Sequence, residues 1–329
     1  MDKESTSYND IFDAFRLALK FYHFWRELIK VNLLALIKIE NSLKNRNELY
    51  HKSTLRILIL AIMISVVIAN YIIITSHPHN SHATALWAMN ITAAIASSLG
   101  IVAVYRHGVR GLHGKSYLFL TLGLISWFSA DLTLLYYYYA LGIEEQKFVT
   151  VTDGLWFIGY GFLSLHLFTI IKSLRRSSNT NNVINRKFVI VGSLIIAVVF
   201  VIFNGFNLMS SEFIGNAGEN ADLTSVAVTL AYPILDLILI IPSSIVLVKL
   251  RKNYQHSIPW FLSSLSLLVN AIADDGYLID FVNGNSQHLI FWDLFYVADF
   301  IIMAGALFWY NRYHITSSRR STKTMEVEP

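Results

Sequence analysis

Four aspartates stand inside long apolar stretches of this sequence and are its strongest candidates for chemistry: Asp131, Asp236, Asp274 and Asp299. A charged side chain at the centre of a membrane-inserted helix costs about 2.5–3.5 kcal/mol on insertion scales. Each of these acids therefore needs compensation by a proton, a cation or hydrogen-bond donors. No Lys or Arg lies in the same stretches at that depth. The four acids are thus the candidate site.

Aromatic residues accompany the acids and are predicted to form the walls of a pocket: Trp127, Trp156, Tyr160 and Tyr277. The alternative is that the acids serve packing alone, by accepting hydrogen bonds from hydroxyl and indole groups of neighbouring helices. Such bonds average about 0.6 kcal/mol in membrane bundles. Four acids at similar depth are costly as architecture alone, which favours a ligand, proton or ion site.

Apolar runs of about 20 residues, long enough to cross a bilayer core, supply the elements that carry these residues. The chain has 329 residues, of which 54% are hydrophobic and 15% charged, too few charges for a soluble surface. The sequence therefore predicts an all-α membrane protein with eight transmembrane helices. They are expected at 54–76, 84–105, 116–141, 151–173, 188–208, 223–249, 258–282 and 288–312.

The basic residues predict the orientation of these helices. Of the 26 Lys and Arg, all but Lys147 fall on one side of the predicted bundle. Because positive charges stay on the cytoplasmic side, that side is expected to be the cytoplasm, with both termini there. At a rise of about 1.5 Å per residue, the four aspartates lie about 12–20 Å below the outer ends of their helices. The positive charge thus indicates topology in a cell membrane, and nucleic-acid binding is not expected.

The two ends of the chain differ from the predicted spans. Residues 1–50 are predicted to form a cytoplasmic amphipathic helix, which lies on the inner leaflet, packs on the bundle or dimerises. Residues 315–329 are polar and are predicted to be a disordered cytoplasmic tail. The apolar stripe of the first segment repeats every three or four residues: Phe12, Phe15, Leu19, Tyr22, Trp25 and Ile29.

A short pattern occurs twice. An Ala-Asp pair ends in Asp131 and again in Asp274, and an Asp-x-apolar-aromatic run follows at 153–156 and at 293–296. An even number of predicted spans separates the copies, so both would have the same orientation. The sequence therefore predicts two parallel four-helix halves, 54–176 and 186–314.

Several other residues have simpler interpretations. Asp153 and Asp293 are predicted to cap the outer ends of two helices, where a carboxylate meets the positive end of the helix dipole. His166 is expected to be a packed polar residue. Pro233 and Pro242 flank Asp236 and predict curvature or a kink of that helix.

Three histidines within six residues, His77, His79 and His82, could bind a divalent transition metal at the outer surface. Their spacing matches no structural zinc pattern. External loops rich in histidine are more often simply solvated, and no cofactor is predicted. The chain contains no cysteine, which excludes disulfides and thiolate chemistry.

The segments around Trp127, Asp131, Trp156 and Tyr160, together with the stretch 230–236 and the second copy of the repeat, resemble multi-span membrane modules. These modules form the N-terminal sensor portions of prokaryotic histidine kinases and diguanylate cyclases. The resemblance implies ligand binding on the outer side and a signal passed to the cytoplasm. No stretch of these 329 residues would form the output domain of such proteins, so signalling is expected to need a cytoplasmic partner.

These observations predict a non-enzymatic membrane sensor or ligand-binding protein with an acidic, aromatic-lined pocket in the outer half of the bilayer. A small ligand or cation is the expected occupant. The alternatives are a cation- or proton-coupled transporter that uses the same aspartates, and an intramembrane hydrolase with an aspartate pair.

Overall fold

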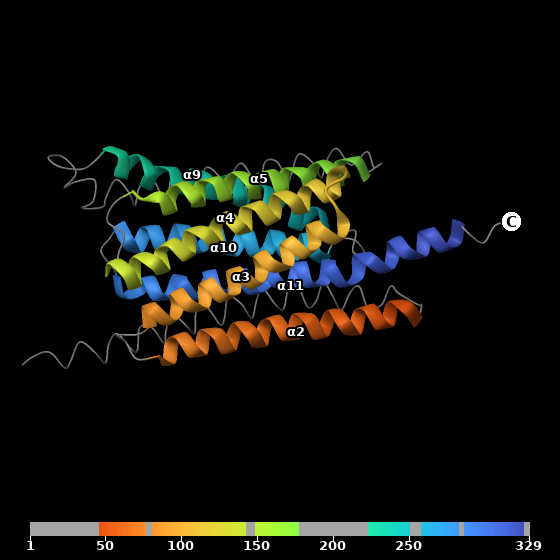
Figure 1. The fold of residues 1–329 in the computed structure, drawn as a ribbon, viewed down its shortest axis with the longest axis horizontal. Helices are drawn as coiled ribbons and strands as arrows, with labels where there is room; N and C mark the ends of the chain where they lie inside the picture. Colours follow the sequence, from red (N-terminus) through yellow and green to blue (C-terminus); the bar gives the residue numbers. More distant parts are fainter. Residues whose placement is uncertain are drawn as a thin grey trace, which may run out of the picture. The chain divides into compact units, whose positions relative to one another are not determined.

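A computed structural model of the chain describes residues 46–76, 81–142, 149–177, 223–250, 258–282 and 286–325. All regular structure in these ranges is helical (Figure 1). The helices are α2 (Arg46–Thr75), α3 (Ser81–His107), α4 (Gly111–Leu141), α5 (Val151–Ser177), α9 (Leu223–Leu250), α10 (Ile258–Val282) and α11 (Ser286–Met325). The chain divides into two compact units, Met1–Ala61 and Ile62–Pro329, and the candidate site lies in the second.

Six of the described helices are long and apolar enough to cross a membrane: α2, α3, α4, α5, α9 and α11. A helix suits this role because it satisfies its own backbone hydrogen bonds without water. The sequence prediction of an all-α, multi-span membrane protein is therefore confirmed. The count of eight spans stays a prediction, since 188–208 lies outside the described residues. The seventh predicted span forms helix α10, which is not among the six. Its polar residues Asn270, Asp274 and Asp275 lower its mean hydropathy.

Six of the described helices pack in a closed ring of neighbours. Helix α3 packs on α4, α4 on α5, α5 on α9, α9 on α10, α10 on α11, and α11 again on α3. In this order α4 and α10 stand opposite each other, as do α5 and α11. The predicted aspartates and aromatic residues of the site lie on α4, α5, α9, α10 and α11. The order of these helices in the ring therefore determines which of the residues can be in contact.

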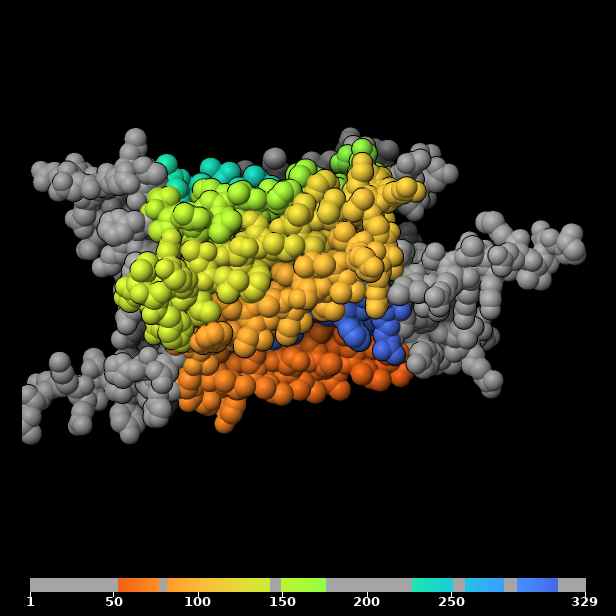
Figure 2. All heavy atoms as spheres, in the orientation of Figure 1, coloured from red at the N-terminus to blue at the C-terminus, as the bar shows by residue number. Residues whose placement is uncertain are grey.

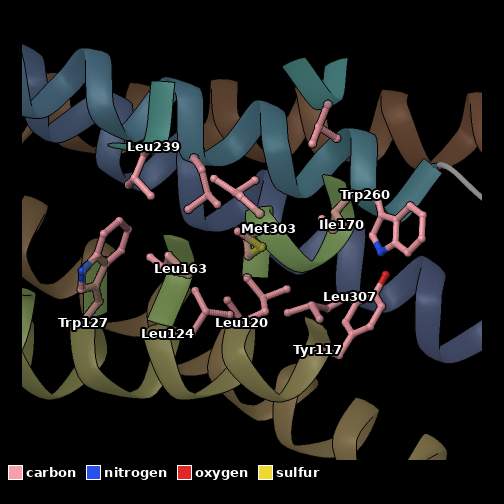
Figure 3. Packing of buried hydrophobic residues seen from close by; sticks show 14 of the residues in the cluster. Tyr117, Leu120, Leu124, Trp127, Leu163, Ile170, Leu239, Trp260, Met303 and Leu307 are labelled. Atoms are coloured by element: carbon pink, nitrogen blue, oxygen red, sulfur yellow. The ribbon is translucent and has the colours of Figure 1, made fainter. Parts of the chain in front are cut away.

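A cluster of buried apolar side chains fills the bundle (Figure 3). Trp127 lies at one end of this core, and Tyr117 and Trp260 lie at the other end. The outer surface is also apolar: on α3 and α4, which form the face in Figure 2, large side chains such as Ile91, Ile95 and Tyr136 are exposed. Apolar groups on both sides of a helix fit a bundle that contacts lipid outside.

Two helix boundaries differ from the sequence predictions. Helix α11 begins at Ser286, so Asp293 lies inside the helix, and its predicted role as a cap is wrong. The same helix continues to Met325 and covers most of the segment predicted to be a disordered tail. No Gly or Pro interrupts it after Gly305, so helix propagation meets no breaker there. The predicted N-terminal amphipathic helix lies outside the described residues, apart from its last few positions in α2.

Glycines allow α4 and α5 to approach closely beside the predicted site. A Cβ on Gly159 of α5 would collide with the indole ring of Trp127 on α4. The Trp127 Nε1 group donates a hydrogen bond of 3.2 Å to the Trp156 carbonyl across this contact. The absence of a side chain at position 159 therefore sets the distance between the two helices.

We expect Gly159→Ala to destabilise the protein by about 1–3 kcal/mol, because an added methyl group overpacks the contact with Trp127. Gly161→Ala is the matched control on the same helix, since a Cβ there meets nothing within 4 Å. Thermal unfolding of the purified proteins in detergent measures the difference. Equal melting temperatures for the two variants would show that the contact does not set the helix spacing.

Candidate functional site

The Tyr160 hydroxyl on α5 joins two aspartates from two other helices. It lies 2.6 Å from Asp236 Oδ1 on α9 and is also hydrogen-bonded to Asp274 Oδ2 on α10. Tyr160 is 2% exposed and Asp236 is fully buried, whereas Asp274 keeps some exposed surface. The hydroxyl thus ties α5, α9 and α10 together at one point within the membrane-spanning bundle.

The number of hydrogens in this contact is informative. A tyrosine hydroxyl has one hydrogen, so it donates to one carboxyl group and accepts from the other. An ionised carboxylate has no hydrogen to donate. The Asp236 and Asp274 carboxyl groups also face each other at hydrogen-bonding range. The arrangement therefore requires one further positive species, either a proton on one carboxyl group or a cation between the two.

Two more tyrosines surround this pair. The Tyr296 hydroxyl on α11 donates to Asp274, and the Tyr277 ring lies 6.4 Å from the Tyr296 ring. Tyr232 on α9 has its ring 6.5 Å from that of Tyr160. Four helices of the ring thus contribute to the surroundings of Asp274.

Asp131 on α4 occupies a related setting. The Trp156 Nε1 group of α5 donates to Asp131 Oδ1 at 3.4 Å, and Asn90 of α3 donates to the Asp131 carbonyl at 3.2 Å. No donor in the described residues reaches Asp131 Oδ2, although the residue is only 3% exposed. Trp127 closes this side, with its ring 5.4 Å from the Tyr160 ring.

Asp299 on α11 is bound by side chains of α10. Ser266 donates to its Oδ1, and the Asn270 side chain also hydrogen-bonds to it. In the structure Asp274 has its direct carboxyl contact with Asp236, since α10 packs on α9 as well as on α11.

The acids of the site have no basic partner. Within the described ranges, no Lys, Arg or His is hydrogen-bonded or ion-paired to Asp131, Asp236, Asp274 or Asp299. Asp236 Oδ2, like Asp131 Oδ2, accepts no hydrogen bond from any described donor. Two ionised carboxylates about 4 Å apart repel by about 4 kcal/mol at an effective dielectric constant of about 20. A bound positive species removes this repulsion.

Asp153 has the capping role predicted for it and a second role besides. Its Oδ2 accepts from the Thr150 backbone N–H at 2.9 Å, as in a capping box at the start of α5. Its Oδ1 accepts from the Tyr232 hydroxyl at 2.7 Å. The cap therefore also fixes α9 against α5, next to the site.

The predicted metal site is only partly within the described residues. His77 and His79 lie outside them, and His82 Nδ1 is 3.8 Å from Asp293 Oδ2. In the part of the chain that the structure describes, no group of three or more His, Asp or Glu is arranged to hold a metal ion. Metal binding by His77, His79 and His82 stays a prediction.

Comparison with known proteins adds no relative. No protein-family model, no curated protein and no solved structure matches this chain. The function must therefore be argued from the site itself, and the resemblance to prokaryotic sensor modules stays a prediction.

Hydrogen bonds and ring contacts link six of the eight predicted site residues: Asp131, Asp236, Asp274, Trp127, Trp156 and Tyr160. Asp299 is bound to Ser266 and Asn270 instead, and the Tyr277 ring lies beside that of Tyr296. The sequence analysis did not single out Tyr296, Tyr232, Asn270 or Ser266 as site residues. Tyr296 could have been found, because it holds the position in the second copy of the repeat that Trp156 holds in the first. Ser266 and Asn270 gave no signal, since serines and asparagines within apolar helices are common packing residues.

We expect Tyr160→Phe to destabilise the protein by about 1.5–3 kcal/mol, the range for a lost hydrogen bond to a charged group. Combined with Asp274→Asn, it should show a coupling of at least about 0.5 kcal/mol, because both changes act on one network. Denaturant unfolding in detergent of the single and double variants measures both quantities. Tyr136→Phe, at a tyrosine that is 59% exposed, is the control for the substitution itself. Strict additivity of the pair would contradict the shared hydroxyl.

Proposed function

We propose that this protein is an integral membrane ligand-binding protein whose Asp236–Asp274 pair takes up a positively charged ligand, either a proton or a small cation. We further propose that occupancy of the pair is transmitted through the helices, which makes the protein a sensor. The observation that carries the proposal is the Tyr160 hydroxyl shared by two carboxyl groups with no basic residue beside them.

Loss of the positive species would leave two like charges between α9 and α10. Their repulsion in a medium of low dielectric constant is larger than a typical net hydrogen bond of about 0.5–1.5 kcal/mol. The helices would then respond by moving apart or by admitting water. Such a response would reach the far ends of α9 and α10, where a partner could detect it.

The prolines of α9 support a movement of this kind. Pro233 and Pro242 lie inside the helix on either side of Asp236. Each removes one backbone hydrogen bond, which weakens the helix locally. A change of charge at Asp236 would therefore act on a segment that bends more easily than its neighbours.

The repeat is part of this proposal. Trp156 donates to Asp131, and Tyr296 donates to Asp274, from matching positions after Asp153 and Asp293. In the ring of helices, α4 and α5 stand opposite α10 and α11, as a two-fold axis along the membrane normal would place them. Two similar halves would thus each supply one aspartate with an aromatic donor, and α9 adds Asp236 to the second half.

The basic residues support a location in a cell membrane with both termini in the cytoplasm. In this orientation the acids lie in the outer half and near the midplane of the bilayer. Asp274, which keeps some exposed surface, would meet an incoming ligand before Asp236 does.

A second candidate is a proton- or cation-coupled transporter that uses the same acids. Carboxylates near the bilayer midplane beside a proline-interrupted helix are the features that favour it. A transporter must carry its ligand to the other side, whereas a sensor needs only to bind it. Transport measurements on the reconstituted protein separate the two.

We expect the infrared spectrum of the wild type to contain the carbonyl band of a protonated carboxylic acid. The band should weaken in Asp236→Asn and in Asp274→Asn, because the amide supplies the missing hydrogen. Asp280→Asn is the matched control, since Asp280 accepts from Trp292 Nε1 at 2.6 Å, away from the pair.

If a cation is bound instead, the band stays unchanged in these variants. One cation of a panel should then raise the melting temperature of the wild type but not of either variant. At 100 times its Kd a ligand stabilises the folded state by about 2.7 kcal/mol. No change in the band and no cation effect would leave the acids as packing residues and refute the proposal.

A further inference from the structure

Polar side chains form a row along the interior face of α10. Asp274, Asn270, Ser266 and Ser263 follow one another at spacings of four, four and three residues, which places them on one face of the helix. Asn270 is 4% exposed, Ser266 is fully buried and Ser263 is 1% exposed. The row covers about 16 Å, more than half of a bilayer core of about 30 Å.

Asp299 of α11 bridges the outer part of this row. It is hydrogen-bonded to both Asn270 and Ser266, one turn apart on α10. Asp274 and Asp131 are the acids near enough to act on it electrostatically. Asn270 Oδ1 accepts no hydrogen bond from any described donor, although the residue is almost fully buried. It is a free acceptor between Asp274 and Asp299.

His166 of α5 contacts Ser263, the innermost residue of the row. Its Nε2 lies 3.3 Å from Ser263 Oγ. Its Nδ1 lies 2.8 Å from the Ser116 carbonyl and 2.9 Å from Ser116 Oγ on α4. The imidazole is fully buried and has a polar contact on each of its nitrogens. A neutral imidazole in this position accepts a proton on one nitrogen and releases one from the other.

Beyond His166, Tyr117 and His113 follow toward the start of α4 through ring contacts, and the Tyr117 hydroxyl has no hydrogen-bond partner among the described residues. The Tyr117 ring lies 6.2 Å from His166 and 5.2 Å from His113. His113 stands near the start of α4 and keeps some exposed surface. The titratable groups along the whole route come from α4, α5, α9, α10 and α11. Helix α4 carries Asp131, Tyr117 and His113, and α5 carries Tyr160 and His166. Helix α9 carries Tyr232 and Asp236, and α10 carries Asp274 and Asp275. Helix α11 carries Tyr296, Asp299 and Tyr310.

We propose that this row conducts protons between the Asp236–Asp274 pair and His113, so that the protein carries protons across the membrane. The proposal rests on the proposed function, in the case where the positive species is a proton. The apolar side chains that fill the bundle, such as Leu163, Leu239 and Met303, favour transfer between fixed groups over passage of a hydrated ion (Figure 3).

Each transfer conserves protons and charge. The protonated pair gives a proton to the Asp299 carboxylate and becomes doubly ionised until it is reprotonated from the outer side. Ser266 accepts the proton of Asp299 on Oγ and releases its own to a water molecule, which hands a proton on to Ser263 Oγ as Ser263 gives its hydrogen to His166 Nε2. His166 releases its Nδ1 proton to Ser116, from which a second water molecule carries a proton to His113. The imidazole then changes tautomer, and the hydroxyl groups turn back before the next transfer.

Proton flux into proteoliposomes tests the route, with a pH-sensitive dye inside and a potassium diffusion potential as the driving force. We expect the wild-type protein to raise the flux above that of protein-free vesicles. His166→Gln should lower the protein-dependent flux by at least about tenfold, since a positioned acid–base group contributes about 10²–10⁴-fold to proton transfer. The amide can keep a hydrogen bond to each neighbour but cannot pass on a proton.

Ser263→Ala and Ser264→Ala form a matched pair of adjacent buried serines. Ser263 contacts His166, whereas Ser264 Oγ has no described hydrogen-bond partner. We expect Ser263→Ala to reduce the flux and Ser264→Ala to leave it unchanged. Equal flux in the wild type, His166→Gln and Ser263→Ala would overturn the route.

The infrared measurement keeps this proposal separate from the function on which it rests. A protonated carboxyl band that depends on Asp236 and Asp274, together with no flux in the wild type, would retain the binding site and refute conduction. A flux that survives both Asp236→Asn and Asp274→Asn would also refute the route, because it would not start at the pair. Melting temperatures of all variants show that each one is folded.

Discussion

The sharing of one tyrosine hydroxyl by two buried carboxyl groups is the contact on which the rest of the site depends. Tyr160, Asp236 and Asp274 come from α5, α9 and α10, and none of the three can satisfy the others without an additional positive species. In water two carboxylates would be separated by solvent. Inside a membrane bundle their repulsion must be cancelled locally, so the charge state of the site and the arrangement of the helices depend on each other.

The ring of helices makes this contact compatible with a membrane protein. The apolar outer faces of the helices meet lipid, and the buried polar side chains of the described residues are spread over the helices, with four each on α4, α5 and α10. Hydrogen bonds from Trp156, Tyr296 and Ser266 satisfy part of each acid. Asp131 Oδ2, Asp236 Oδ2 and Asn270 Oδ1 are among the buried oxygens that accept no hydrogen bond from any described donor.

Packing alone is the simplest role for many of the polar residues. The number of hydrogen bonds that each acid accepts distinguishes the packing residues from the candidate binding residues. Asp153 caps α5 and accepts from Tyr232, so both of its oxygens are bound and it needs no ligand. Asp236 differs, because it is fully buried and its only described donor is a hydroxyl that it shares with another acid. The proposed function therefore rests on Asp236 and Asp274.

The sequence by itself predicted an all-α, multi-span membrane protein, and the bounds of the described helices agree with most of the predicted spans. Apolar length and charge placement allow this prediction because they follow directly from the cost of moving groups into a bilayer. It also pointed to Trp127, Trp156 and Tyr160. Only the tertiary structure decided that Asp274 meets Asp236 rather than Asp299, that Tyr160 lies between them, and that His166 joins Ser263 to Ser116. These contacts depend on how each helix is rotated about its axis and on which helices are neighbours. A sequence of long apolar helices leaves both open, since most faces of such a helix are equally apolar.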